Sequence, residues 1–207
     1  ASVALSHLGR FEDEIGCYDR VLEIDENHIG AWHYKGLALQ NLGKLEEEIE
    51  CYDRALQIDE NYVDAWNNKG VALNKLRRYD EALECFGRVL QIDESDVRAW
   101  YNKGNAHHEL KNYKKAIACY DKATKINPKY SEAHNNMGNI LFLTKKYKDA
   151  LVWVNKAIKF DKNNVNAYET KCSILYELKK YLQALAAGEK SVKMGSKDKD
   201  TLHEIKK

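Results

Sequence analysis

The chain of 207 residues carries 33 Lys and Arg against 32 Asp and Glu, a formal net charge of +1. This balance argues against nucleic acid and anionic membranes as partners, and 44% hydrophobic residues exclude an intrinsically disordered chain. With 1 Pro and 11 Gly, the sequence holds few helix breakers, and Ala, Leu, Lys and Glu are abundant. We therefore expect an all-α fold.

One internal period organises the whole chain, and it is 34 residues long. Three tryptophans, four glycines and four cysteines recur at this spacing: Trp32, Trp66 and Trp100; Gly36, Gly70, Gly104 and Gly138; Cys17, Cys51, Cys85 and Cys119. With the tryptophan as position 4, a partial unit at 1–28 precedes full units at 29–62, 63–96, 97–130, 131–164 and 165–198. A partial or capping helix follows at 199–207. We interpret residues 1–207 as a single array.

Within each unit the apolar positions are 4, 7 and 11, then 17, 21, 24 and 28, with a turn near positions 14 to 16. This spacing predicts two antiparallel helices per unit. Position 8 is Gly in four units, and position 20 is Ala in four, at Ala82, Ala116, Ala150 and Ala184. Small residues there predict a close approach of two helices. The aromatic residues at position 24 are predicted to fill the core: Tyr18, Tyr52, Phe86 and Tyr120.

The segments AWNNKG at 65–70 and RRYDEALECF at 77–86 carry the strongest pattern. They resemble the tetratricopeptide repeat family, and the resemblance extends over essentially the whole chain. It implies a right-handed superhelical α-α solenoid, with the first helix of each unit on the concave side, and a protein-binding scaffold instead of an enzyme. Three departures stand out, one of them the last full unit, which has Cys172 at the glycine place and Gly188 at the aromatic place. Only Pro128 keeps the usual inter-repeat proline, and His134 replaces the tryptophan while Trp153 takes the next place of the cysteine series.

The resemblance also implies a groove lined by positions 2, 5, 6, 9, 12 and 13 of each first helix. Amides are frequent at these places, and an amide both donates and accepts hydrogen bonds, so a row of them suits an extended peptide backbone. Aromatic residues join the amides towards the C-terminus. The predicted partner-binding residues are Asn67, Asn68, Tyr101, Asn102, Asn105, Asn135, Asn136, Asn139, Phe142 and Tyr176.

A second groove chemistry of the family is the clamp for acidic C-terminal tails, which needs cations at fixed positions. The matching places here hold Tyr101, Asn105, Asn136, Asn166 and Thr170. No cation is present at any of them, so a terminal carboxylate would find no charged partner there. We therefore reject this clamp from the sequence.

Other chemistry finds little support. The 5 cysteines form no CxxC pair, and residues one repeat apart sit ~10 Å apart, too far to share a zinc ion. No Ser-His-Asp set, phosphate-binding loop or paired catalytic carboxylates stand at a meaningful spacing. We expect no cofactor, no metal and no catalysis, and the cysteine usage favours a reducing cytoplasm.

Two alternatives to a peptide-binding scaffold stay open. One is a self-assembling scaffold, a homo-oligomer formed through the terminal repeats. The other is the regulatory arm of a larger enzyme. By register, Ala1 falls at position 7 of a unit, and Leu202, Ile205 and Lys207 fall at positions 4, 7 and 9 of another. An array cut inside a helix at both ends suggests a fragment of a longer protein.

Overall fold

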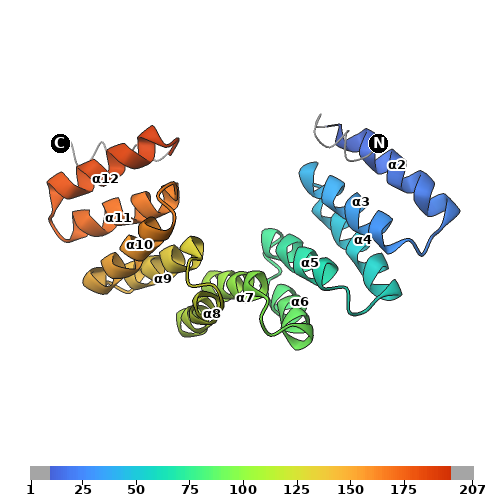
Figure 1. Cartoon of the computed structure of the whole chain (residues 1–207), viewed down its shortest axis with the longest axis horizontal. Helices are drawn as coiled ribbons and strands as arrows, with labels where there is room; N and C mark the ends of the chain where they lie inside the picture. The colour runs from blue at the N-terminus through green and yellow to red at the C-terminus, as the bar shows by residue number, and fades with distance from the viewer. Residues whose placement is uncertain (1–9, 197–207) are drawn as a thin grey trace. The chain divides into compact units, whose positions relative to one another are not determined.

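The computed structural model describes residues 10–196, and every regular element within this range is an α-helix (Figure 1). The all-α prediction is confirmed. The predictions for Ala1, Leu202, Ile205, Lys207 and the helix at 199–207 lie outside the described residues. The helices are α2 Phe11–Ile24, α3 Ile29–Asn41, α4 Leu45–Ile58, α5 Val63–Lys75, α6 Tyr79–Ile92, α7 Val97–Glu109, α8 Tyr113–Ile126, α9 Ser131–Leu143, α10 Tyr147–Phe160, α11 Val165–Glu177 and α12 Tyr181–Lys193.

The turns inside the repeats share one geometry. After α3, Gly43 adopts a positive φ of 73°, its N–H donates to the Gln40 carbonyl, and the N–H of Lys44 donates to the Leu39 carbonyl. These two bonds form the Schellman ending of a helix, in which the left-handed residue favours glycine. The equivalent position is not glycine in the later repeats, where φ lies between 58° and 62° at Arg77, Lys111, Lys145 and Lys179.

The glycine at position 8 lets the two helices of a hairpin approach closely. A Cβ built on Gly36 would lie 2.6 Å from a ring carbon of Tyr52, and one built on Gly70 would lie 2.6 Å from Phe86. Both rings are completely buried. Tyr52 also packs with Ala65 of the following repeat, so the aromatic residue at position 24 joins its own hairpin to the next.

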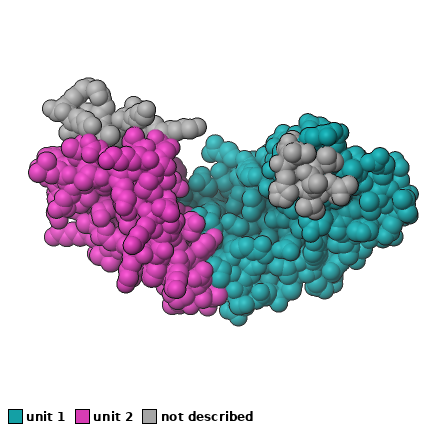
Figure 2. Space-filling view, turned by 45° about the horizontal axis from the view of Figure 1, so that its top comes forward, with its two compact units in different colours: residues 1–110 teal, residues 111–207 magenta. Residues whose placement is uncertain are grey.

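The chain separates into two compact units, residues 1–110 and residues 111–207, which are coloured separately in Figure 2. In unit 1, α3 packs on α4, α5 on α6, and α7 on both α5 and α6. In unit 2, α8 and α10 pack on α9, while α11 packs on α9, α10 and α12. The boundary falls inside the predicted repeat 97–130. A single array over 1–207 stays a prediction.

Candidate partner-binding surfaces

Five of the predicted groove residues lie in unit 1, where α5 and α7 pack against each other: Asn67 and Asn68 on α5, and Tyr101, Asn102 and Asn105 on α7. The Nδ2 of Asn67 donates to Oδ2 of Asp96 at 3.2 Å. Asp96 is the N-cap of α7 and accepts from the Ala99 N–H at 2.8 Å. Asn67 is only 3% exposed, so its side chain links two repeats and presents little surface to a partner. Tyr101, Asn102 and Asn105 are partly exposed.

Asn68 belongs to a partly buried hydrogen-bond network centred on the buried His33. The Nδ2 of Asn68 lies 3.0 Å from Nε2 of His33, and Nδ1 of His33 lies 2.7 Å from the Tyr62 hydroxyl. An amide nitrogen only donates, so Nε2 accepts and the neutral imidazole carries its proton on Nδ1. Burial lowers the pKa of His33, and the Asp64 carboxylate partly opposes this effect. The imidazole is therefore neutral at physiological pH.

His33 lies at position 5, which the family pattern assigns to the groove. Its place beside the groove could therefore have been predicted from the sequence. Next to it, the ring of Tyr34 is 52% exposed. It stacks on Tyr18 with centroids 6.1 Å apart and an interplanar angle of 19°. Unit 1 therefore presents an exposed aromatic ring that was not among the predicted site residues.

The other five predicted residues lie in unit 2, with Asn135, Asn136, Asn139 and Phe142 on α9 and Tyr176 on the neighbouring α11. Asn136 donates from Nδ2 to the Tyr120 hydroxyl at 3.4 Å. Asn135 is buried, with 7% exposure, whereas Asn136 and Asn139 are half-buried. The structure thus brings each set of five together within its own unit, and the two amides at position 5 are the least accessible.

Phe142 and Tyr176 each pair with a tyrosine that opens the following helix. The ring centroids of Phe142 and Tyr147 are 5.7 Å apart, and those of Tyr176 and Tyr181 are 5.6 Å apart. Sequence reasoning missed Tyr147 and Tyr181, although tyrosine recurs at position 17 of four units. Tyr181 is 50% exposed, so this aromatic surface continues from the groove positions to the turns.

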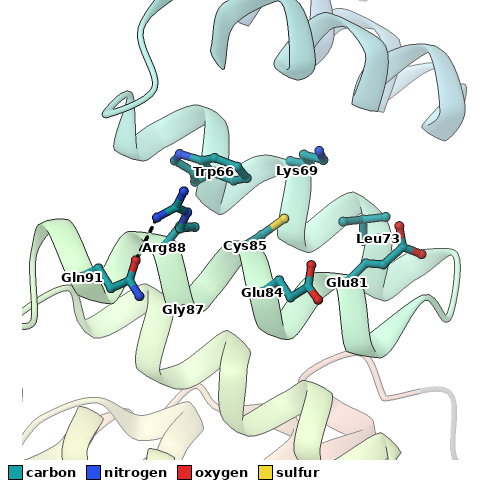
Figure 3. A pocket seen from close by; sticks show the side chains of 9 residues that line it. All are labelled: Trp66, Lys69, Leu73, Glu81, Glu84, Cys85, Gly87, Arg88 and Gln91. Carbon is teal, nitrogen blue, oxygen red and sulfur yellow. Dashed lines mark hydrogen bonds between the residues drawn. The ribbon is translucent and has the colours of Figure 1, made fainter. Parts of the chain in front are cut away.

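A cavity of about 550 Å³ lies between α5 and α6 (Figure 3). Trp66, Lys69, Cys85 and Arg88 line it, and the Arg88 guanidinium donates to Gln91 at 3.2 Å. A second cavity has Trp32, Lys35, Cys51 and Arg54 at the same repeat positions. Because the same positions form both, the cavity is a feature of the repeat and not a site in itself.

The cysteines in these cavities are poor nucleophiles. Burial raises the pKa of the Cys85 thiol to about 11 and that of Cys51 to about 12. A thiol that stays protonated neither attacks nor binds metal readily. Among the described residues, no group of His, Cys, Asp and Glu side chains could hold a metal ion. Within residues 10–196, no helix has the length and apolar character to cross a bilayer.

Comparison with solved structures gives the same fold at low sequence identity. The MamA fragment of Desulfovibrio magneticus RS-1 is 23% identical, with a TM-score of 0.72, over 79% of this chain and 92% of that one. YrrB, a TPR protein with an unusual peptide-binding site, is 19% identical, with a TM-score of 0.66, over 92% and 98%. A tetratricopeptide repeat protein from Parabacteroides merdae is 17% identical, with a TM-score of 0.79, over 100% and 82%.

No curated protein matches the chain. Family models do match it. A tetratricopeptide repeat model matches residues 63–96, 97–130 and 131–164, which are the bounds of three units read from the sequence. Further models of TPR repeats match residues 41–77 and 17–50. From Cys17 to Asn164 the matches are continuous, and the chain belongs to the tetratricopeptide repeat family.

Proposed function

We propose that this chain is a protein-interaction module that binds an extended partner segment along the first helices of its repeats, and that it performs no catalysis itself. The observation that carries the proposal is that each unit has half-buried amides and an aromatic ring on a first helix: Tyr101, Asn102 and Asn105 on α7 of unit 1, and Asn136, Asn139 and Phe142 on α9 of unit 2. Each presents part of its side chain to solvent while the helix backbone holds it rigidly. Amides at such positions suit a peptide backbone without demanding particular side chains.

Two further observations support a binding role. The chain belongs to a family of repeat proteins, and the similar protein YrrB has a peptide-binding site. Stacked repeats build long, continuous surfaces from short helices, which is how such scaffolds recognise extended partners. The reducing cytoplasm stays our proposed compartment, since all five cysteines are free thiols.

A peptide library displayed on phage and selected on the purified chain tests the proposal. The triple variant Asn102→Ala, Asn136→Ala and Phe142→Ala should weaken binding of a selected peptide by tenfold or more, because truncation removes amide hydrogen bonds and an aromatic contact. The control variant Arg54→Ala and Gln57→Ala changes exposed residues on α4. Equal binding by the wild type and the triple variant, with unchanged helicity by circular dichroism, would show that the peptide binds elsewhere.

A further inference from the structure

The near-zero net charge of the chain conceals two opposite charges. Residues 1–110 contain 12 Lys and Arg against 22 Asp and Glu, a formal charge of −10. Residues 111–207 contain 21 Lys against 10 Asp and Glu, a formal charge of +11. A whole-chain sum therefore does not describe the field of either unit, and unit 2 by itself is strongly basic.

Part of this excess lies at the turns between the two helices of each repeat. The turn after α9 carries Lys145 and Lys146, with Lys148 following in the first turn of α10. The turn after α11 carries Lys179 and Lys180. All five residues are exposed. We call this set, Lys145, Lys146, Lys148, Lys179 and Lys180, the lysine edge.

In unit 1, an acid pairs with the last cation of each corresponding turn, although Arg77 in the turn after α5 forms no ion pair within residues 10–196. The cation directly before each second helix forms an ion pair with an acid three residues later, in the pairs Arg10–Asp13, Lys44–Glu47 and Arg78–Glu81. At the lysine edge, Asp149 keeps the acid after Lys146, whereas Gln183 takes its place after Lys180. Within residues 10–196, no ion pair of the five edge lysines is formed. The cation before each second helix is thus paired in unit 1, whereas in unit 2 the described residues offer the edge lysines no ion pair.

The two turns of the lysine edge belong to neighbouring repeats that contact each other. The helices α10 and α11 pack against each other, and the pKa of Tyr147 at the start of α10 is raised by burial and by the nearby Glu177 carboxylate at the end of α11. Neighbouring helices pack ~10 Å apart, so the two lysine pairs recur at about this distance. A segment in the polyproline II conformation advances ~3.1 Å per residue and repeats its side-chain direction every three residues, so every third residue of a bound segment would meet the next pair.

Apolar side chains accompany the cations. Leu143 is 48% exposed, Tyr181 is 50% exposed and Leu182 is 85% exposed. Leu143 immediately precedes one turn, and the other two residues immediately follow the second turn. A partner with both carboxylates and apolar side chains would use both parts of this surface, since apolar contact adds affinity that exposed ion pairs alone do not give.

The chemistry favours a protein segment over other polyanions. Unit 2 contains lysine but no arginine, although arginine is preferred where phosphate is bound by two parallel hydrogen bonds. The acids Asp149 and Glu177 stand among the lysines, and a flat anionic membrane would be brought against them. An extended segment can place neutral residues opposite the acids and carboxylates opposite the lysines.

We propose that the lysine edge is a docking surface for an extended, acidic protein segment, with carboxylates recurring at every third residue and apolar side chains between them. This surface adjoins the aromatic pair Tyr176–Tyr181 next to the groove positions, but its lysines are not among the amide positions and it does not depend on a partner bound there. The occupant is identified by charge complementarity to a row of cations, which form no ion pair in the part of the chain that the structure describes and which have apolar neighbours.

The test uses a fluorescent peptide with Glu at every third position and Leu between, titrated with the whole chain and followed by anisotropy. The edge variant replaces Lys145, Lys146, Lys179 and Lys180 by Gln. The control replaces Lys129, Lys159, Lys162 and Lys193, four exposed lysines of the same unit, so both variants lose the same charge. We expect the edge variant to weaken binding by tenfold or more, the control by less than threefold, and binding to weaken as salt rises.

Further arms separate the alternative occupants. A peptide with Gln in place of Glu should not bind. Equal affinities of the edge and control variants for the acidic peptide would overturn the proposal, because binding would then follow total charge. The proposal would also fail if phosphatidylserine vesicles or a single-stranded oligonucleotide bound and the acidic peptide did not. It would fail equally if the peptide did not bind but sedimentation showed that the wild type self-associates and the edge variant does not. That result would assign the lysine edge to the acidic unit of a second copy.

Discussion

Replacing Gly70 by Ala should destabilise unit 1, although alanine is the better helix former. Gly70 lies in the interior of α5, where Gly→Ala normally stabilises by about 0.5–1 kcal/mol. The added Cβ, however, would lie 2.6 Å from Cε1 and 2.8 Å from Cζ of Phe86. Phe86 is completely buried and cannot move away without displacing its neighbours. Overpacking of this kind costs about 1–3 kcal/mol, so after the propensity gain we expect a net loss of up to about 2.5 kcal/mol.

The same repeat supplies a matched control. Gly87 lies in the interior of α6, and a Cβ built there would meet nothing within 4 Å. Gly87→Ala should therefore stabilise by about 0.5–1 kcal/mol. Urea unfolding followed by circular dichroism compares the two variants with the wild type. If Gly70→Ala proved as stable as Gly87→Ala, α5 and α6 would not be held at so close a separation, and the explanation for the repeated glycine would be wrong.

Three further outcomes are expected. Lys145→Gly should stabilise the chain by about 1 kcal/mol, because Lys145 has a φ of 60°, in the left-handed region that favours glycine. Gly43→Ala should destabilise it by a similar amount for the same reason. Thermal melts of both variants check these changes. Cys85 should react slowly with a thiol reagent in the native chain and rapidly in urea, since burial raises its pKa to about 11; equal rates would contradict its burial. Burial raises the pKa of the Glu48 carboxyl above its ordinary value of 4.5, so the folded chain holds this proton more tightly than the unfolded chain does. The stability that the protonated carboxyl contributes is fully present below the unfolded pKa. It is lost as the pH rises through the folded pKa. Glu48→Gln should therefore flatten the fall in stability between pH 4 and pH 7 in urea titrations, and an unchanged slope would refute this.

The 34-residue period predicts much of the fold because each repeat makes the same contacts. The tryptophans, glycines and position-24 rings recur together, and α3, α5, α7, α9 and α11 begin at residues 29, 63, 97, 131 and 165. The period does not reveal where a repeat departs from its own rule. Glu48 stands at position 20, where four repeats have Ala, and it is completely buried. Its Oε1 accepts from Gln40 at 2.8 Å, a partner that no pattern of single residues predicts.

The sequence also could not predict which of the groove residues are accessible to a partner. Position 5 faces inward on the helix of one isolated repeat, but the N-cap of the next repeat covers it. Asn67 bonds to Asp96 and His33 bonds to Tyr62, each 29 residues away. The positive charge of unit 2 can be counted from the sequence, but it cancels against unit 1 in a sum over the whole chain. Counting it separately requires the boundary between the units, which is a property of the folded chain.

The exchange of His134 and Trp153 shows how a repeat can change its residues and keep its contacts. In three repeats the indole Nε1 donates to a backbone carbonyl six residues earlier at 2.8 Å, in the pairs Trp32–Glu26, Trp66–Glu60 and Trp100–Glu94. In the fourth, Nε2 of His134 contacts the Pro128 carbonyl at 2.9 Å. A carbonyl oxygen only accepts, so the proton of the neutral imidazole is on Nε2 and the same bond is preserved.

In the fourth repeat, the indole is supplied by the second helix instead of the first. The Trp153 ring on α10 stacks on the His134 ring with centroids 5.6 Å apart, and the Phe160 ring also stacks on His134, with centroids 5.3 Å apart. A smaller ring at position 4 leaves room for a larger one at position 23, where the other repeats have cysteine, so the total volume of the pair is approximately kept. Lys156 lies 4.0 Å from the Trp153 ring centroid, and burial lowers the pKa of His134. The fourth repeat therefore differs from the others in chemistry on its second helix while the packing of its two helices is retained.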